Sequence, residues 1–174
     1  PQKEKKEKKI PTNDDMRRIF DHIYGKRIEL AVYLAAICGM RRGEICALRT
    51  SDIDIEHNLI RIHRSVALDN DNTLCEKSPK TVAGNRTIRI FAPVLEVIKR
   101  TKFQDEYVVP FRRPDSLTAC FATQTGNLNM SYTFHSLRHF AVSSMISLNM
   151  PKKYIIEYVG HENEEMVDWI ANQG

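Results

Sequence analysis

The chain has 174 residues, of which 42% are hydrophobic and 28% charged, a composition typical of a folded globular protein. No apolar run approaches the roughly 20 residues of a membrane-spanning helix, and nothing at the start of the given sequence resembles a secretory signal. The formal net charge of +4 permits a polyanionic partner without requiring one.

The N-terminal segment and the cysteines narrow the class of protein further. Residues 1–10 are rich in lysine and glutamate and predict a solvated linker or arm, with the folded part over 11–174. Because the chain begins with proline rather than methionine, we expect a piece of a longer protein. The cysteines form no CxxC or Cys/His cluster, which predicts reduced intracellular thiols and no zinc site. They are Cys38, Cys46, Cys75 and Cys120.

The first part of the folded region predicts three helices. Thr12 followed by Asp15 has capping-box spacing, and apolar residues then recur at helical intervals until Gly25. A second helix, over 28–38, is apolar almost all round, which indicates a central buried helix. A short third helix is expected over 42–48.

The pattern then changes to the alternation of apolar and polar residues that is typical of strands. Three segments alternate in this way: 59–66, 73–77 and 86–91. They predict a small three-stranded antiparallel sheet, with turn residues between the first two strands. One short extended piece, 106–111, and five further helices complete the chain, near 93–100, 115–123, 135–148, 152–159 and 164–171. The expected fold class is therefore α+β, mostly helical, in a single domain.

Cationic side chains recur where these elements begin or end. Arg41 follows a glycine that ends the buried second helix, so its side chain should emerge from a structured corner. Glu44 could hold this guanidinium in planar, two-bond geometry, although a plain surface ion pair would look the same in sequence. Lys80 lies in the turn before the third strand, where a lysine commonly serves only solubility.

The segment TFHSLRHF, residues 133–140, contains three proton donors and no acid. His135 and Arg138 are three residues apart on a predicted helix, so they share a face and can point at one anion. His139 points elsewhere, and we expect it to pack or bond within the core. His161 follows a predicted helix directly after a glycine that permits close approach.

Together these candidates favour metal-free chemistry on a phosphodiester. Guanidinium groups suit nonbridging phosphate oxygens and can stabilise the extra charge of pentacoordinate phosphorus. A metal-dependent nuclease would instead need carboxylates that converge on ions, and the sequence arranges none in that way. It also contains no glycine-rich phosphate loop. We therefore expect no metal and no cofactor.

Four motifs in order, CGMRRGEICALRTSDID, SPKTVAGNRTIRI, HSLRHF and VGH, resemble the catalytic domain of the tyrosine recombinase family, the phage and transposon integrases. The resemblance runs from about residue 11 to 165. It implies the fold of DNA breaking-rejoining enzymes, double-stranded DNA as partner, no cofactor, and a cytoplasmic, nucleoid-associated protein of bacterial or phage origin. It also implies a preceding domain and a full-length tetramer on paired DNA sites, with this piece monomeric by itself.

The resemblance implies five catalytic residues: Arg41, Lys80, His135, Arg138 and His161. The two arginines would bind the scissile phosphate, and the first histidine would act as general base or phosphate donor. The lysine would protonate the leaving 5′ oxygen, and the last histidine would be a further phosphate ligand. Glu44 would support the first arginine, and His139 is a second supporting residue.

In this family a tyrosine attacks the phosphate and forms a 3′-phosphotyrosyl link, which a 5′-hydroxyl from another strand reverses. That tyrosine is expected near Ala171, but the last tyrosines of the chain are Tyr154 and Tyr158, and both precede the VGH motif. We expect Tyr158 to pack in the fold. Three explanations remain open: an altered or truncated tail, a degenerate gene, or a nucleophile from another subunit. As written, the chain should bind DNA phosphate without cleaving.

Two other functions remain open. A noncatalytic DNA-binding regulator derived from a recombinase would account directly for the absent tyrosine. A metal-free phosphodiesterase that uses His135 as nucleophile or base would turn over small phosphodiesters in the presence of chelators, and Arg41→Ala would abolish that turnover.

Overall fold

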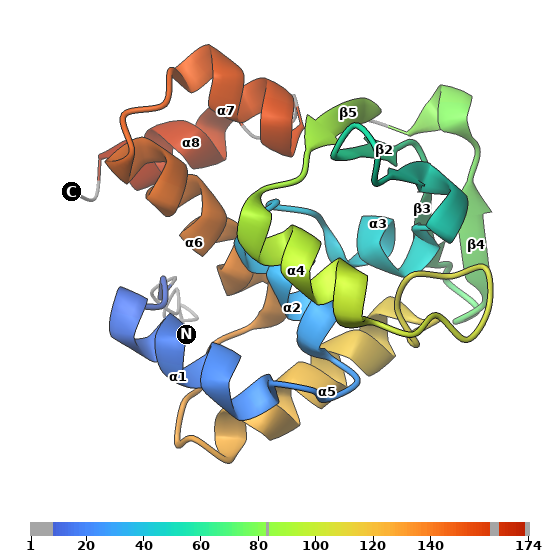
Figure 1. The fold of residues 1–174 in the computed structure, drawn as a ribbon, viewed down its shortest axis with the longest axis horizontal. Helices are drawn as coiled ribbons and strands as arrows, with labels where there is room; N and C mark the ends of the chain where they lie inside the picture. The colour runs from blue at the N-terminus through green and yellow to red at the C-terminus, as the bar shows by residue number, and fades with distance from the viewer. Residues whose placement is uncertain (1–8, 83, 161–163, 173–174) are drawn as a thin grey trace.

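The computed structural model of the protein describes residues 9–82, 84–160 and 164–172. Within them, α-helices are combined with two small antiparallel sheets, so the predicted α+β, mostly helical class is confirmed (Figure 1). None of the described helices is both long and apolar enough to cross a membrane. The α-helices are α1 (Asn13–Ile23), α2 (Glu29–Ala36), α3 (Arg42–Ala47), α4 (Ala92–Arg100), α5 (Pro114–Gly126), α6 (Phe134–Ser147), α7 (Lys152–Val159) and α8 (Glu164–Ala171).

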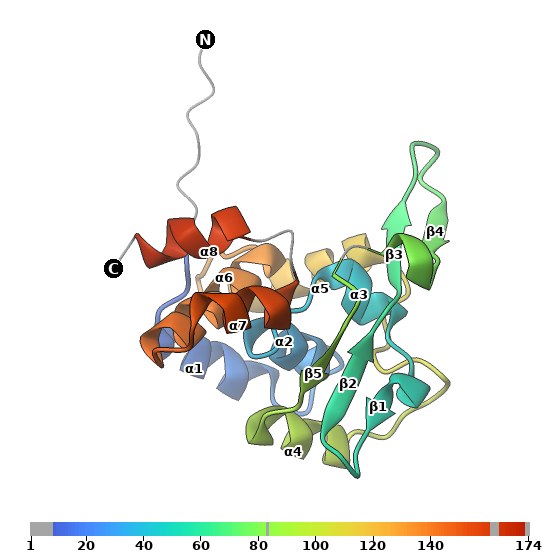
Figure 2. The ribbon, with the colours of Figure 1, turned by 90° about the horizontal axis from the view of Figure 1, so that it is seen from above.

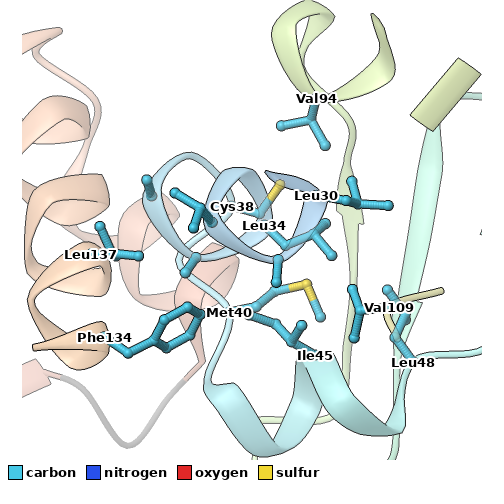
Figure 3. Close-up of a cluster of buried hydrophobic side chains, with 14 of the residues drawn as sticks. Leu30, Leu34, Cys38, Met40, Ile45, Leu48, Val94, Val109, Phe134 and Leu137 are labelled. Atoms are coloured by element: carbon cyan, nitrogen blue, oxygen red, sulfur yellow. The ribbon is translucent and has the colours of Figure 1, made fainter. Parts of the chain in front are cut away.

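The apolar helix α2 lies at the centre of the core, as its sequence predicts. All of its residues except Tyr33 are buried, and it packs against α6, α4 and α3. Met40 and Phe134 belong to the same buried cluster, and Figure 3 shows the Phe134 ring pointing toward Met40. These two anchors come directly before Arg41 and His135, so the core fixes the backbone from which both side chains leave.

Helix α1 begins at the predicted cap. Thr12 Oγ1 accepts a hydrogen bond from the backbone N–H of Asp15 at 3.1 Å. The Asp15 carboxylate accepts a second hydrogen bond, from the hydroxyl of Tyr132. This contact ties α1 to the segment that leads into α6.

The strands pair differently from the prediction. Strands β1 (Ile53–Asp54), β2 (Leu59–Ile62) and β5 (Arg86–Arg89) form a three-stranded antiparallel sheet in the order β1-β2-β5. Strands β3 (Ser65–Leu68) and β4 (Leu74–Lys77) form a separate antiparallel hairpin. The predicted composition of the sheet, from 59–66, 73–77 and 86–91, is therefore wrong: the first segment is two strands, and the second pairs only within the hairpin.

A buried carboxylate explains why the first predicted strand is divided. Asp52 is the last residue of the short 3-10 helix η1 (Thr50–Asp52) and is 8% exposed. Its Oδ1 lies 2.8 Å from Nε2 of His63, and its Oδ2 accepts a hydrogen bond from Nη1 of Arg64 at 2.8 Å. These contacts hold the two residues after β2 against η1, so the ladder with β5 ends at Ile62. The turn end of the β3–β4 hairpin projects beyond the helices (Figure 2), whereas β3 itself packs against α3.

Glycine at position 43 is required where α3 meets β3. A Cβ on Gly43 would lie 2.5 Å from the carbonyl oxygen of Val66 and 2.7 Å from Oγ of Ser65. We expect Gly43→Ala to lower the free energy of unfolding by about 1–3 kcal/mol, because helix and strand must separate. Gly126, the last residue of α5, has no atom within 4 Å of its Cβ position. Gly126→Ala should therefore raise the same quantity by about 0.4–1 kcal/mol. Urea unfolding of both variants measures the two changes in the free energy of unfolding, which should have opposite signs.

Candidate active site

Arg41 stands at a sharp corner between α2 and α3. Gly39 makes the corner with a φ of +65°, and a Cβ there would lie 2.7 Å from Cγ1 of Val159. Met40 is fully buried, and Arg41 follows it as the N-terminal capping residue of α3. The backbone N–H of Arg41 donates to Oε1 of Glu44 at 2.9 Å. The side chain therefore emerges from a structured corner, as predicted.

His135 and Arg138 lie in the first two turns of α6. Thr133 and Ser136 cap this helix reciprocally: each side-chain oxygen accepts the backbone N–H of the other residue at 3.2 Å. His135 is exposed, whereas Arg138 is 1% exposed. The cap therefore begins the helix where both side chains come onto one face.

A pocket of about 460 Å³ lies between the starts of α3 and α6 and is bordered by α5 and β3. Arg41, His135 and Arg138 all line it. Arg42 lines it too, and its Nη1 donates to Oγ1 of Thr118 at 2.8 Å. The structure thus brings three of the five predicted catalytic residues, from segments far apart in the sequence, to one cavity.

Arg138 is buried but poorly paired. Its Nη2 donates to the carbonyl of Val159 at 3.4 Å, while Nε and Nη1 are buried and have no hydrogen-bond partner among the described residues. Burial first, and then the positive charge of Arg41, lowers the pKa of Arg138 to about 9, and the Glu44 carboxylate opposes this shift. An anion in the pocket would supply both the missing acceptors and the missing charge.

Glu44 pairs more closely with Arg86, a residue that the sequence analysis did not single out, than with Arg41. Arg86 donates to it through two nitrogens, Nη1 to Oε2 at 2.8 Å and Nη2 to Oε1 at 3.1 Å. Arg41 Nη1 lies 3.4 Å from Oε2. Burial by itself raises the pKa of Glu44, but the charge and hydrogen bonds of Arg86, followed by those of Arg41, lower it overall. The carboxylate is therefore an anion shared by two guanidinium groups.

The strand pattern contained a signal for Arg86. In RTIRI, residues Arg86, Ile88 and Ile90 alternate onto one face of β5 and its continuation, and both isoleucines are buried. A charged residue on the buried face of a strand needs a partner. Alternation could thus have identified a buried cation at this position, although not the carboxylate that it meets.

The other two predicted catalytic residues are Lys80 and His161. Lys80 lies exposed in the 3-10 helix η2 (Pro79–Thr81) and is not among the residues that line the pocket. Gly84, in the same connection between β4 and β5, approaches the site: a Cβ on it would lie 3.1 Å from Nη1 of Arg41. His161 lies outside the described residues.

His139 is buried, as expected, and connects the pocket to α8. Its ring centroid is 4.8 Å from that of His135 in an edge-to-face arrangement and 5.8 Å from that of Trp169. Helix α8 packs against α6 and α7. A chain of three rings therefore runs from the pocket to the helix on which the family's tyrosine is expected.

The last two tyrosines of the sequence lie in α7. Tyr158 is 5% exposed and its hydroxyl donates to the carbonyl of Arg89 at 2.7 Å, so the prediction that it packs is confirmed. Burial and the neighbouring Cys38 raise the pKa of Tyr158 far above its ordinary value. Tyr154 is 41% exposed and stacks on Tyr158. Tyr158 therefore has the features of a structural residue.

The donors that line the pocket include guanidinium and imidazole groups, which can hold an oxyanion. In the described part of the chain, no group of three or more His, Cys, Asp or Glu side chains is placed to hold a metal ion.

Comparison with known proteins gives the family. The chain matches the family model described as "Phage integrase family" over residues 9–173. The chain belongs to the phage integrase family. It is 26% identical over 157 residues to the integrase of Staphylococcus phage L54a, a match that covers 78% of this chain and 44% of the relative. It is 28% identical over 144 residues to the type 1 fimbriae regulatory protein FimB of Escherichia coli K12, covering 78% and 68%.

This integrase-family chain spans about half the length of the first curated relatives it matches, 44% and 49%. Among solved structures it is similar to the Tn1549 transposon integrase in complex with transposon right end DNA, with a TM-score of 0.79 and 20% identity over 98% of this chain and 63% of that one. It is also similar to XerA recombinase, with a TM-score of 0.70 and 17% identity over 98% and 61%. The predicted tyrosine recombinase fold is thus confirmed.

Proposed function

We propose that this chain is the catalytic domain of a tyrosine recombinase and that its pocket binds the scissile phosphate of double-stranded DNA. The observation that carries the proposal is Arg138, which has two buried, unpartnered nitrogens and lines a pocket together with Arg41 and His135. Family membership supports the reaction class, site-specific recombination or integration. The Tn1549 integrase, similar in fold, is described in complex with transposon DNA.

Each residue has a role in this proposal. Arg41 and Arg138 hold the nonbridging oxygens and stabilise the added charge of pentacoordinate phosphorus. His135, exposed at the pocket, donates to the phosphate or accepts the proton of the nucleophile. Lys80 protonates the leaving 5′ oxygen when η2 lies against the DNA, and His161 is a further phosphate ligand.

The proposed reaction conserves the energy of the phosphodiester bond. A tyrosyl oxygen replaces the 5′ oxygen on phosphorus, which leaves a 3′-phosphotyrosyl link and a 5′-hydroxyl, and a 5′-hydroxyl from another strand then displaces the tyrosine. No tyrosine follows Tyr158 in this sequence. We therefore propose that the chain as written binds DNA phosphate without cleaving, and that the full-length protein acts as a tetramer on paired sites.

Salt dependence of DNA binding tests the phosphate contact. Arg41→Ala should weaken binding to a duplex and reduce the slope of log affinity against log salt by about 1, because one phosphate contact is lost. Arg17→Ala removes the same charge from an exposed ion pair with Asp14 on α1 and should leave that slope unchanged. Fluorescence anisotropy over a salt series measures both. Equal slopes for the two variants would rule out Arg41 as a phosphate ligand.

A noncatalytic DNA-binding regulator is the second candidate, favoured by the absence of a tyrosine after Tyr158. One relative, FimB, is named a regulatory protein. This candidate shares the phosphate pocket but predicts no covalent chemistry in any variant. The phosphodiesterase alternative predicts turnover of bis(p-nitrophenyl) phosphate in chelator, and its absence would exclude that activity.

A further inference from the structure

Arg86 is buried at a junction of three segments of the site. Its Nη1 and Nη2 hold the Glu44 carboxylate of α3. Its Nη1 also donates to the carbonyl of Gly84 at 2.7 Å, and its Nε donates to the carbonyl of Tyr158 at 2.8 Å. The side chain is 6% exposed. One guanidinium therefore links α3, the connection that carries Lys80, and the end of α7.

Two glycines leave room for this junction. A Cβ on Gly84 would lie 3.1 Å from Nη1 of both Arg41 and Arg86, and a Cβ on Gly160 would lie 3.2 Å and 3.4 Å from the same atoms. Both glycines have positive φ, +79° and +107°. The two guanidinium groups therefore lie together between the backbone that follows Lys80 and the backbone that ends α7.

Among the described residues at this junction, the single carboxylate of Glu44 lies close to three guanidinium groups. Arg41, Arg86 and Arg138 are mutually repulsive, and the charges of both Arg41 and Arg86 disfavour the charged form of Arg138. Glu44 is 2% exposed, and a buried carboxylate needs a close cationic partner. Because Arg86 makes the shorter, two-bond pair, Arg41 contacts the same carboxylate at the longer distance of 3.4 Å.

We propose that Arg86 is the positioning residue of the phosphate pocket. It neutralises Glu44, so that the Arg41 guanidinium is directed to the pocket rather than drawn onto the carboxylate. It also fixes the backbone next to Lys80 and at the end of α7. The inference rests on the proposed function, since the ligand that Arg41 would receive is a DNA phosphate.

A double substitution separates this role from a purely structural one. In Arg86→Met the buried Glu44 turns to Arg41, and duplex affinity should fall by about tenfold, within the range of coupling in charge networks. In the double variant Arg86→Met with Glu44→Gln the carboxylate charge is gone, Arg41 is released, and most of the affinity should return. Fluorescence anisotropy gives the affinities, and thermal unfolding gives the stability of each variant.

A matched control is present elsewhere in the fold. Arg100 Nη1 and Nη2 donate to the carboxylate of the buried Glu29 at 2.5 Å and 2.7 Å, in the same two-bond geometry, and neither residue lines the phosphate pocket. Arg100→Met should lower stability and leave duplex affinity unchanged. If Arg86→Met binds as the unsubstituted chain does, or if the double variant binds no better than Arg86→Met, the positioning role is refuted.

A measurement on the unsubstituted protein covers the case in which Arg86→Met does not fold. In ¹⁵N spectra, duplex addition should shift the Nε–Hε signal of Arg41 and leave that of Arg86 in place, because its donors remain on Glu44, Gly84 and Tyr158. An equal shift of Arg86 would make it a DNA ligand and overturn the proposal. Failure of the unsubstituted chain to bind duplex, or binding unaffected by Arg41→Ala, would instead refute the proposed function.

Discussion

Replacing Arg138 by methionine should stabilise the protein and at the same time remove most of its affinity for DNA. Arg138 buries a positive charge and two unpartnered nitrogens in the described structure, and its remaining hydrogen bond, to Val159, is long at 3.4 Å. Each buried, unsatisfied polar group costs about 1–3 kcal/mol. Methionine fills similar volume without that cost, so the free energy of unfolding should rise by about 1–3 kcal/mol.

DNA affinity should move the other way in the same variant. Hydrogen bonds between charged groups contribute about 1.5–3 kcal/mol, so loss of the Arg138 contacts should weaken binding by about tenfold or more. Arg112→Met is the control: Arg112 is half-buried, but unlike Arg138 it donates to two carbonyls, those of Cys46 and Val109. That variant should lose stability and keep its affinity. A destabilised Arg138→Met would show that the guanidinium serves the fold rather than an anion.

Restoring a tyrosine in α8 should convert a binding chain into one that forms a covalent link with DNA. Ala171 is exposed at the end of α8, so it can take a phenol without displacing a packed side chain. On a nicked duplex that traps the intermediate, Ala171→Tyr should yield a protein–DNA adduct stable to detergent, and the unsubstituted chain should yield none. Denaturing gel electrophoresis of labelled DNA measures this difference.

Two further variants define the register of the nucleophile. Trp169→Tyr places the phenol where the indole lies 5.8 Å from the His139 ring, on the ring chain that leads to the pocket. An adduct with this variant alone would place the nucleophile two residues before Ala171. Glu165→Tyr, exposed in the first half of α8, is the control and should give no adduct. Intact DNA binding with no adduct from Ala171→Tyr or Trp169→Tyr would favour the noncatalytic regulator.

Local patterns identified most elements and the residues around which the pocket forms. The eight helices of the described chain agree with the predicted ones because spacing, caps and glycines act between residues three or four apart. The same locality put His135 and Arg138 on one helical face, and both line the pocket. Strand partners were less predictable: segment 59–66 alternates throughout, but Asp52, outside it, divides it after Ile62.

The sequence by itself determined the family motifs, the helical framework, the candidate residues and the absence of a tyrosine after Tyr158. Only the tertiary structure decided that Glu44 pairs with Arg86, 42 residues away, and that Arg138 is buried with unpartnered donors beside Arg41. The physical reason is the difference in range between the interactions involved. Periodicity and capping depend on neighbours along the chain, whereas ion pairing and desolvation depend on which distant segments the core brings together.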